Sequence, residues 1–243
     1  MNVIKPTTSE YNIIANVKKN IVFIFVSDLH GCENEPIYEV LRSVRHDAIL
    51  VGGDFVHDEK NYKKGIEFLK TVSESEKCFV CLGNHDSCFP SDIRKAVKDC
   101  GATLLDNSYV DFNGIKLAGF TSGEFYMPGK IPNLKWLEGF ASLDGFKLLL
   151  CHRPEYFKKY IKKFDVDLTI SGHAHGGQWR VFGHGIYAPG QGIFPKYTSG
   201  LYENRLIVSR GLGNPHIIPR INNTPEILVI NIIPKSLNTE ENK

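Results

Sequence analysis

The stretch IVFIFVSDLH (residues 21–30) joins an unbroken apolar run, Ile21–Val26, to an aspartate and a histidine two positions apart, Asp28 and His30. Four later segments repeat this arrangement: Ala48–Val51 precedes Gly53-Asp54, residues 78–82 precede Gly83-Asn84-His85-Asp86, residues 147–150 precede Cys151-His152, and residues 167–170 precede Gly172-His173-Ala174-His175. Such short runs, rich in β-branched and aromatic residues, predict buried β-strands. The polar residues therefore follow strand C-termini, which in open α/β sheets meet at one crevice where a ligand binds.

Side chains that follow these strands carry oxygen or imidazole nitrogen donors. The seven donors are Asp28, His30, Asp54, Asn84, His152, His173 and His175. A donor set without sulfur suits divalent Mn, Fe, Zn or Mg. Seven ligands are too many for one tetrahedral ion, whereas two divalent metal ions that share one carboxylate account for all of them. Two dications with two aspartates leave a charge of about +2, which would attract a phosphate anion.

One histidine of the third motif, His85, lies between Asn84 and Asp86. A proton donor beside a metal-bound phosphate is what the departure of a leaving group requires. We therefore predict that His85 and Asp86 are catalytic residues, with Asp86 orienting the imidazole ring of His85.

The ordered set DLH, GGD, GNHD, CH and GHAH resembles the signature of the calcineurin-like metallophosphoesterase superfamily. The resemblance implies a first metal bound by Asp28, His30, Asp54 and His175, and a second bound by Asp54, Asn84, His152 and His173. Asp54 is then the bridge, and His85 is the general acid or transition-state stabiliser with Asp86 behind it. The stretches GHAHGGQ (172–178), YAPGQGIFPKYTSGLY (187–202), SRGLG (209–213) and PRINNTPEI (219–227) further resemble the bacterial phosphodiesterase branch, and the similarity runs over residues 21–232.

Between the motifs, apolar residues at helical spacing predict helices over residues 35–45, 62–75, 91–98 and 155–164, with a start signal for the third at Ser91 and Asp92. Asn113-Gly114, between residues 110–112 and 115–120, is a strong hairpin signal. Residues 201–209 predict another hairpin and residues 226–233 a closing strand. The pattern indicates an α/β (α+β) fold of two packed mixed sheets flanked by helices, in agreement with the four-layer αββα sandwich that the resemblance implies.

The chain has 243 residues, 42% of them apolar, which is enough for one substantial core. No linker, repeat or low-complexity run separates the motifs, and the predicted metal site draws on both halves of the chain. We therefore predict a single domain over residues 1–235, followed by a polar tail over residues 236–243.

The net charge is +2 with acidic and basic residues mixed, so no basic stripe supports nucleic-acid binding. The N-terminal stretch lacks an apolar core of signal-peptide length, and Ile21–Val26 is too short to span a bilayer. We expect a cytoplasmic protein without a transmembrane segment. Cys78 and Cys81 lie three positions apart in a predicted strand, on opposite faces, which favours reduced core thiols over a metal or redox pair.

Several residues beside the ligands are candidates for contact with a substrate. They are Arg153, Arg210, Gly176, Gly177 and Gln178, together with His57. Each has a structural alternative: Arg210 is either an anion contact or a buried arginine that holds the C-terminal loops together. The two glycines either permit close approach of the backbone to a ligand or serve only the turn. Residues 124–136 either cap the site or form a plain connection.

We expect hydrolysis of phosphodiester bonds in a small-molecule substrate, with phosphomonoesters as a second ester class, by in-line attack of a metal-bound hydroxide. Two alternatives stay open. One is a pyrophosphatase acting on a nucleotide-linked lipid sugar, which a large apolar surface beside the metals would favour. The other is a non-catalytic interaction module stabilised by metal. The sequence does not identify the substrate, the metals or the oligomeric state.

Overall fold

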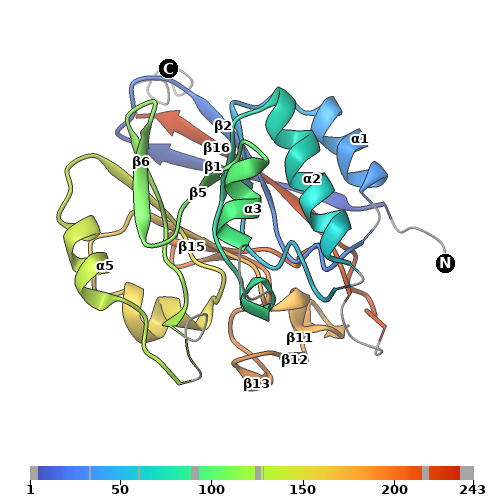
Figure 1. The fold of residues 1–243 in the computed structure, drawn as a ribbon. Helices are drawn as coiled ribbons and strands as arrows, with labels where there is room; N and C mark the ends of the chain where they lie inside the picture. Colours follow the sequence, from blue (N-terminus) through green and yellow to red (C-terminus); the bar gives the residue numbers. More distant parts are fainter. Residues whose placement is uncertain are drawn as a thin grey trace, which may run out of the picture.

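Two six-stranded sheets face each other at the centre of the protein (Figure 1). The computed structural model describes residues 5–32, 34–59, 61–88, 93–123, 127, 129–214 and 219–235. The first sheet has the order β1-β16-β2-β3-β4-β5, in which β16 and β2 are antiparallel and all other neighbours are parallel. Its strands are β1 (Thr7–Ala15), β16 (Glu226–Pro234), β2 (Ile21–Val26), β3 (Ala48–Val51), β4 (Cys78–Val80) and β5 (Thr103–Leu104).

The second sheet has the order β14-β15-β9-β8-β7-β6, with parallel pairing from β15 to β7 and an antiparallel hairpin at each end. Its strands are β14 (Gly200–Tyr202), β15 (Leu206–Val208), β9 (Leu168–Ser171), β8 (Phe146–Leu150), β7 (Ile115–Gly119) and β6 (Ser108–Phe112). Strands β3, β8 and β9 are buried along their whole length. This is the pattern of parallel strands that are covered on both faces.

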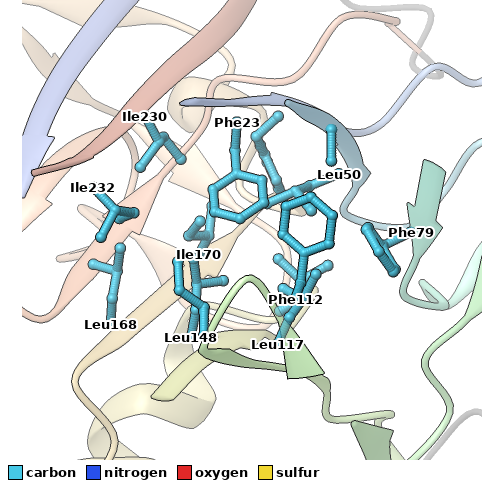
Figure 2. Close-up of a cluster of buried hydrophobic side chains, with 14 of the residues drawn as sticks. Phe23, Leu50, Phe79, Phe112, Leu117, Leu148, Leu168, Ile170, Ile230 and Ile232 are labelled. Atoms are coloured by element: carbon cyan, nitrogen blue, oxygen red, sulfur yellow. The ribbon is translucent and has the colours of Figure 1, made fainter. Parts of the chain in front are cut away.

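Large apolar side chains from both sheets fill the space between them (Figure 2). Phe23 of β2 and Phe112 of β6 come from different sheets, and their ring centroids are 5.6 Å apart. Phe79 of β4 lies edge-on to Phe112, with a centroid separation of 5.3 Å. Burying one phenylalanine side chain contributes about 1.5–3 kcal/mol. The contacts among these three rings therefore contribute substantially to the packing of one sheet against the other.

Helices cover the outer face of each sheet. The first sheet packs against α1 (Glu35–Ser43), α2 (Tyr62–Ser75) and α3 (Ile93–Asp99) through a second apolar cluster. The second sheet packs against α5 (Leu134–Ala141) and the helical turn Phe157–Ile161 through a third. The layers thus run helix, sheet, sheet, helix, which confirms the predicted αββα fold.

Most predicted elements are present, and some end at different residues. Strands β2 and β3 and helix α2 have the predicted bounds. The helix predicted over residues 35–45 ends at Ser43, because Val44 adopts an extended backbone. The helix predicted over residues 155–164 contains a widened turn, in which the amide of Lys162 donates to the carbonyl of Phe157. Both predicted hairpins and the closing strand β16 are confirmed.

The structure also contains elements that the sequence patterns did not indicate. They are β1, β5, α5, and two short hairpins, β10 (Arg180–Val181) with β11 (His184–Gly185) and β12 (Tyr187–Ala188) with β13 (Gly192–Ile193). Strand β1 alternates polar and apolar residues only in part, since Ile13 and Ile14 are adjacent and Ile14 is exposed. The start signal at Ser91 and Asp92, the tail over residues 236–243 and part of the stretch 124–136 lie outside the described residues.

The two cysteines of the Cys78–Cys81 pair belong to different apolar clusters on opposite faces of the first sheet, as predicted. Both thiols are free, and burial raises the pKa of each to about 12. They are therefore packing residues. None of the helices in the described part of the chain combines the length and apolar character needed to cross a bilayer.

Replacing Phe112 with alanine should lower the free energy of unfolding by about 3–5 kcal/mol, because it removes the ring that joins the sheets and leaves a cavity. Urea unfolding followed by circular dichroism measures this change. Tyr109→Ala is the matched control, since Tyr109 lies in the same strand but is 45% exposed. Equal losses in the two variants would contradict the proposed role of Phe112.

Candidate metal centre

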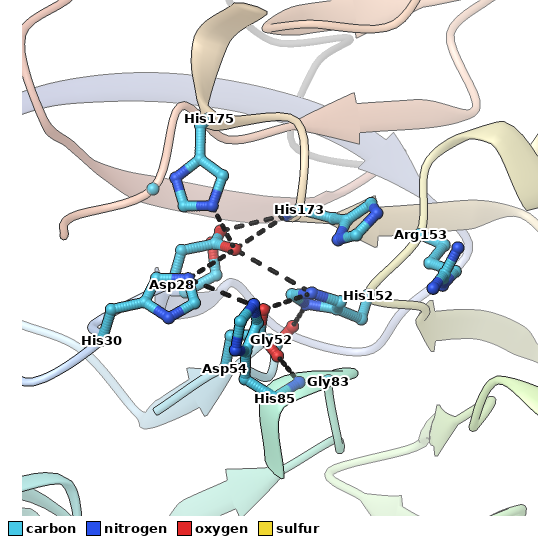
Figure 3. A network of polar contacts seen from close by, with 12 residues as sticks. Asp28, His30, Gly52, Asp54, Gly83, His85, His152, Arg153, His173 and His175 are labelled. Atoms are coloured by element: carbon cyan, nitrogen blue, oxygen red, sulfur yellow. Dashed lines mark hydrogen bonds and ion pairs between the residues drawn. The ribbon is translucent and has the colours of Figure 1, made fainter. Parts of the chain in front are cut away.

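Five strand ends meet at one place, and they come from both sheets (Figure 3). Parallel strands β2, β3 and β4 of the first sheet lead into the three N-terminal motifs. Parallel strands β8 and β9 of the second sheet lead into the two histidine motifs. Parallel strands place their carboxyl ends at the same edge of a sheet. The packing of the two sheets therefore brings together residues that lie as far apart in sequence as Asp28 and His175.

The backbone at these strand ends is unusual. Five of the seven predicted ligands have positive φ, namely Asp28 (55°), His30 (48°), Asp54 (54°), His173 (65°) and His175 (46°). This left-handed conformation costs a residue other than glycine of order 1–3 kcal/mol and is concentrated at functional sites. The rest of the fold therefore holds these five residues in a backbone conformation that they do not adopt readily by themselves.

The first group of donors consists of Asp28, His30 and His175, whose ligand atoms all lie within 4.8 Å of one another. Oδ1 of Asp28 is 3.6 Å from Nε2 of His175 and 3.9 Å from Nε2 of His30. All three residues are buried. They are three of the four residues predicted to bind the first metal.

The second group consists of Asp54, His152 and His173, also within 4.8 Å of one another. Oδ2 of Asp54 is 3.2 Å from Nε2 of His152 and 3.6 Å from Nε2 of His30. One carboxylate oxygen thus lies between a histidine of each group. This position is the one that the predicted bridging role requires of Asp54.

Neighbouring backbone groups fix the orientation of the ligands. Nδ1 of His152 lies 2.7 Å from the carbonyl of Gly52, so Nδ1 donates and Nε2 is the atom that would bind a metal in place of a proton. The carboxylate of Asp28 accepts from the hydroxyl of Ser27 at 2.7 Å and from the amide of His173 at 3.1 Å. The hydrogen bond from the amide of His173 also links the last histidine motif directly to the first motif.

Several buried donor atoms in this region have no hydrogen-bond partner among the described residues. They are both ring nitrogens of His30, Nε2 of His152, Nε2 of His173 and Oδ1 of Asn84. Buried polar atoms are almost always satisfied in native proteins, and unpaired ones point to a bound ion or water. Imidazole nitrogens and an amide oxygen with free lone pairs are metal ligands. The residues therefore fit divalent metal ions.

Burial sets the protonation of most of these histidines. It lowers the pKa of His30 to about 3 and holds those of His173 and His175 well below the usual range. These imidazoles are neutral, which is the form that binds a metal. Asp54 and His152 attract each other as an opposite-charge pair: although burial opposes both shifts, the pKa of Asp54 falls well below its usual range and that of His152 rises to about 9.

Asp86 has contacts that differ from the predicted ones. Its carboxylate accepts hydrogen bonds from the amides of Asp54 at 2.8 Å, Gly83 at 2.7 Å and Val56 at 3.3 Å. No hydrogen bond or ion pair in the described part of the chain joins it to the ring of His85. Burial, and then the charge of Asp54, raise the pKa of Asp86 to about 7. These contacts make Asp86 a positioning residue for the turn that carries the predicted bridge.

His85 lies beside the two groups of donors. Its amide donates to Oδ1 of Asp54 at 2.8 Å, and its ring centroid is 4.9 Å from that of His30. His57 completes a third cluster, with ring centroids 4.7 Å from His85 and 5.1 Å from His30. His57 and His85 thus lie side by side next to the predicted metal ligands.

Of the two interpretations of Arg210, the contacts support the structural one. Its guanidinium donates to Thr7 at 3.0 Å and to Glu226 at 3.3 Å, which ties β1 to β16. Arg220, which the sequence patterns did not indicate, also approaches the centre. Its Nη2 lies 3.3 Å from Nδ1 of His175, and its Nη1 donates to the carbonyl of Arg210. The only sequence signal for Arg220 is its place in the PRINNTPEI stretch.

The other candidates for substrate contact also have partners within the protein. Arg153 pairs with Glu155 at 3.4 Å, and Figure 3 places it beside His173. The amide nitrogen of the Gln178 side chain donates to Asn214 at 3.0 Å. Gly176 and Gly177 both have positive φ and closely approach Asn223 and Gly185. For the glycines and Gln178, these contacts support the turn interpretation.

Comparison with known proteins identifies the family. Residues 21–177 match the model of the calcineurin-like phosphoesterase family. The chain therefore belongs to the calcineurin-like phosphoesterases, which are metal-dependent phosphoric ester hydrolases. Its relatives include the phosphodiesterase YaeI of Escherichia coli, 27% identical over 86% of this chain and 81% of that protein. Another is the uncharacterized metallophosphoesterase YkoQ of Bacillus subtilis, 24% identical over 86% and 83%. The solved structure of the calcineurin-like phosphoesterase YfkN from Bacillus subtilis aligns over 80% of this chain and 82% of its own, with 13% identity and a TM-score of 0.49.

Gly83→Ala should weaken metal binding about 10–100-fold, because the added methyl group would collide with the carboxylate and amide of Asp54. Calorimetric titration with Mn²⁺ measures the affinity. Gly139→Ala is the matched control: in helix α5 the new methyl group meets nothing within 4 Å. Its metal affinity should not change, and its stability should rise by about 0.5–1 kcal/mol. Unaltered Mn²⁺ binding by Gly83→Ala would argue against Asp54 as a ligand.

Proposed function

We propose that the protein hydrolyses phosphodiester bonds at a centre of two divalent metal ions. One observation carries this proposal: two triads of buried donors, Asp28-His30-His175 and Asp54-His152-His173, meet at the carboxylate of Asp54. A single ion would leave one triad unused. Asn84, with its unpartnered amide oxygen, would complete the second ligand set.

When bound, such a metal pair supplies Lewis-acid activation of the phosphoryl group and of an attacking water. The protein's own contribution is orientation. Asp54 would hold the two sites at a fixed spacing, and the amides that bind Asp86 would keep the Asp54 turn in place. Arg153, beside His173, is the candidate for contact with a phosphate oxygen (Figure 3). A small-molecule phosphoester is the proposed substrate.

His85 is the proposed proton donor to the leaving oxygen. Its amide is anchored on Asp54, so its imidazole is carried by the same turn as the predicted bridge. His85 is half-buried, whereas the predicted metal-binding histidines are buried, and it is thus the more accessible imidazole. Accessibility suits a group that must exchange its proton with solvent between turnovers.

The preference for diesters rests on the relative named phosphodiesterase YaeI. A second candidate, a pyrophosphatase acting on a nucleotide-linked lipid sugar, is favoured by one observation. The segment after His175 exposes several large apolar side chains, among them Trp179 and Phe182. Hydrolysis of a lipid-linked pyrophosphate in detergent micelles, at a higher rate than any soluble diester, would select this candidate.

The first experiment compares an aryl phosphodiester with its phosphomonoester analogue. Metal-stripped protein should be inactive and should regain diester hydrolysis on addition of Mn²⁺, with slower hydrolysis of the monoester. Asp54→Ala should bind little metal and stay inactive, because it removes the proposed bridge. The matched control is Asp111→Ala, an exposed carboxylate paired with Lys116 in the β6–β7 hairpin. Full activity and full metal content in Asp54→Ala would overturn the bridging assignment.

His85→Ala should lower kcat by about 10²–10⁴-fold while the metal content stays unchanged, because loss of a general acid affects only the chemical step. The loss should be larger for a diester with a poor leaving group than for a nitrophenyl diester, which needs less protonation. His184→Ala, an exposed histidine in β11, is the control. Loss of metal together with activity would show that His85 is a ligand instead.

A further inference from the structure

A group of exposed apolar side chains lies directly after the last metal-ligand motif. This hairpin surface consists of Trp179, Val181, Phe182, Tyr187, Ile193 and Phe194, carried on or beside the β10–β11 and β12–β13 hairpins. Phe182 is 96% exposed, Phe194 77% and Ile193 71%. Figure 1 shows β11, β12 and β13 together at one edge of the molecule. Tyr187 pairs with Ile193, and the amide of Ile186 donates to the carbonyl of Trp179, so the two hairpins are joined. Exposed apolar side chains gathered on neighbouring hairpins mark an interaction site.

Phe182 and Phe194 are exposed although their backbone conformation is unfavourable for a bulky residue. Val181 pairs with His184, so Phe182 and Gly183 form a two-residue turn, and both have positive φ (48° and 82°). Such turns favour asparagine, aspartate or glycine at the position that Phe182 occupies. Phe194 also has positive φ, 53°. At both positions a bulky side chain in a costly conformation points into solvent, where it contributes nothing to the core.

Lysines outnumber carboxylates next to the hairpin surface. The carboxylates there are Glu155, which lies beside Gly190 and pairs with Arg153, and Glu203. From Leu168 to Tyr202 the sequence contains no aspartate or glutamate. The lysines at positions 158, 159, 162, 163 and 196 are all exposed. Lys162 and Lys196 both pair with Glu203, which places the lysine-rich turn next to the end of the hairpin segment. The next carboxylate after these lysines, Asp165, is paired with Lys147.

The hairpins are attached to the turn that follows the predicted metal ligands. The amide of Ile186 donates to the carbonyl of Gly177 at 3.0 Å, and the guanidinium of Arg180 donates to the carbonyl of Gly176 at 2.7 Å. Gly177 lies only two residues after His175. Whatever binds the hairpin surface is therefore held close to the candidate metal centre.

We propose that the hairpin surface docks the protein on an anionic lipid bilayer and presents the metal centre to phosphoesters at the bilayer surface. Aromatic side chains partition into the membrane interface, and each lysine near an anionic surface strengthens binding. A second copy of the chain is a poorer occupant, because an isologous contact would bring the lysines of both copies together. The part of the proposal that concerns the substrate rests on the proposed hydrolase function, whereas docking itself does not.

Docking is measured by co-sedimentation with vesicles of equal parts phosphatidylglycerol and phosphatidylcholine, and with vesicles of phosphatidylcholine alone. We expect binding to the anionic vesicles that weakens with salt. The double variant Phe182→Ser/Phe194→Ser should lower the partition coefficient about tenfold or more. Exchanging Lys158 and Lys162 for glutamate should weaken binding to the anionic vesicles. The control Ile14→Ser/Tyr109→Ser changes exposed apolar residues on β1 and β6, outside the surface, and should bind like the original protein.

Trp179 provides an independent readout. The chain has two tryptophans, and Trp136 is stacked against Phe140. In the Trp136→Phe background, the emission of Trp179 should shift to shorter wavelength when anionic vesicles are added. An unchanged spectrum, together with equal sedimentation of the original protein and the phenylalanine variant, would overturn the proposal.

A dimer that the phenylalanine substitutions dissociate, without vesicle binding, would also overturn the proposal, because the occupant would then be a second copy. Hydrolysis of the soluble aryl diester separates docking from catalysis. The phenylalanine variant should keep this activity. If every variant lacks it while vesicle binding depends on Phe182 and Phe194, then the proposed hydrolase function fails and docking stands.

Discussion

Two carboxylates, Asp28 and Asp54, are buried where the ends of both sheets meet, and their burial is the constraint on which the site depends. An isolated buried charge is far too costly to keep without partners. The partners here are backbone amides, a serine hydroxyl and imidazole rings, supplied by loops from distant parts of the chain. The left-handed backbone at five ligand positions belongs to the same arrangement, since it turns these side chains toward one point. These protein groups neutralise the two carboxylates only in part, and divalent cations would neutralise the remaining negative charge.

The geometry of the site depends on how the two sheets pack in the core. Asp28 and Asp54 follow strands of the first sheet, whereas His152, His173 and His175 follow strands of the second. The distance between the two donor groups is therefore set by the apolar layer in which Phe23 and Phe112 meet. Close-packed interiors transmit displacements. A small shift of one sheet against the other would therefore change the distances from the carboxylate of Asp54 to His30 and to His152.

The donors that meet at the candidate centre could be found in the sequence because each follows an apolar run that identifies its own strand. Other features leave no such pattern. Asp86 was expected to orient His85, but it binds amides of residues 54, 56 and 83, and amide donors have no sequence signature. Arg210 and Arg220 are both arginines in C-terminal loops, and only the packing of β1 against β16 shows which of them contacts Glu226 and which approaches His175. Strand β1 escaped prediction because edge strands need not alternate cleanly. The short hairpins after His175 contain too few residues for any periodicity.

The place of β16 in the first sheet has a consequence for how the protein folds. This strand follows every other described strand in the sequence, yet it lies between β1 and β2, the two earliest. During synthesis β1 and β2 emerge first and have no partner between them until residues 226–234 have left the ribosome. Contacts across such long stretches of chain form slowly, and open strand edges attract other chains in the meantime. Until β16 pairs with both strands, the facing edges of β1 and β2 stay open to other chains.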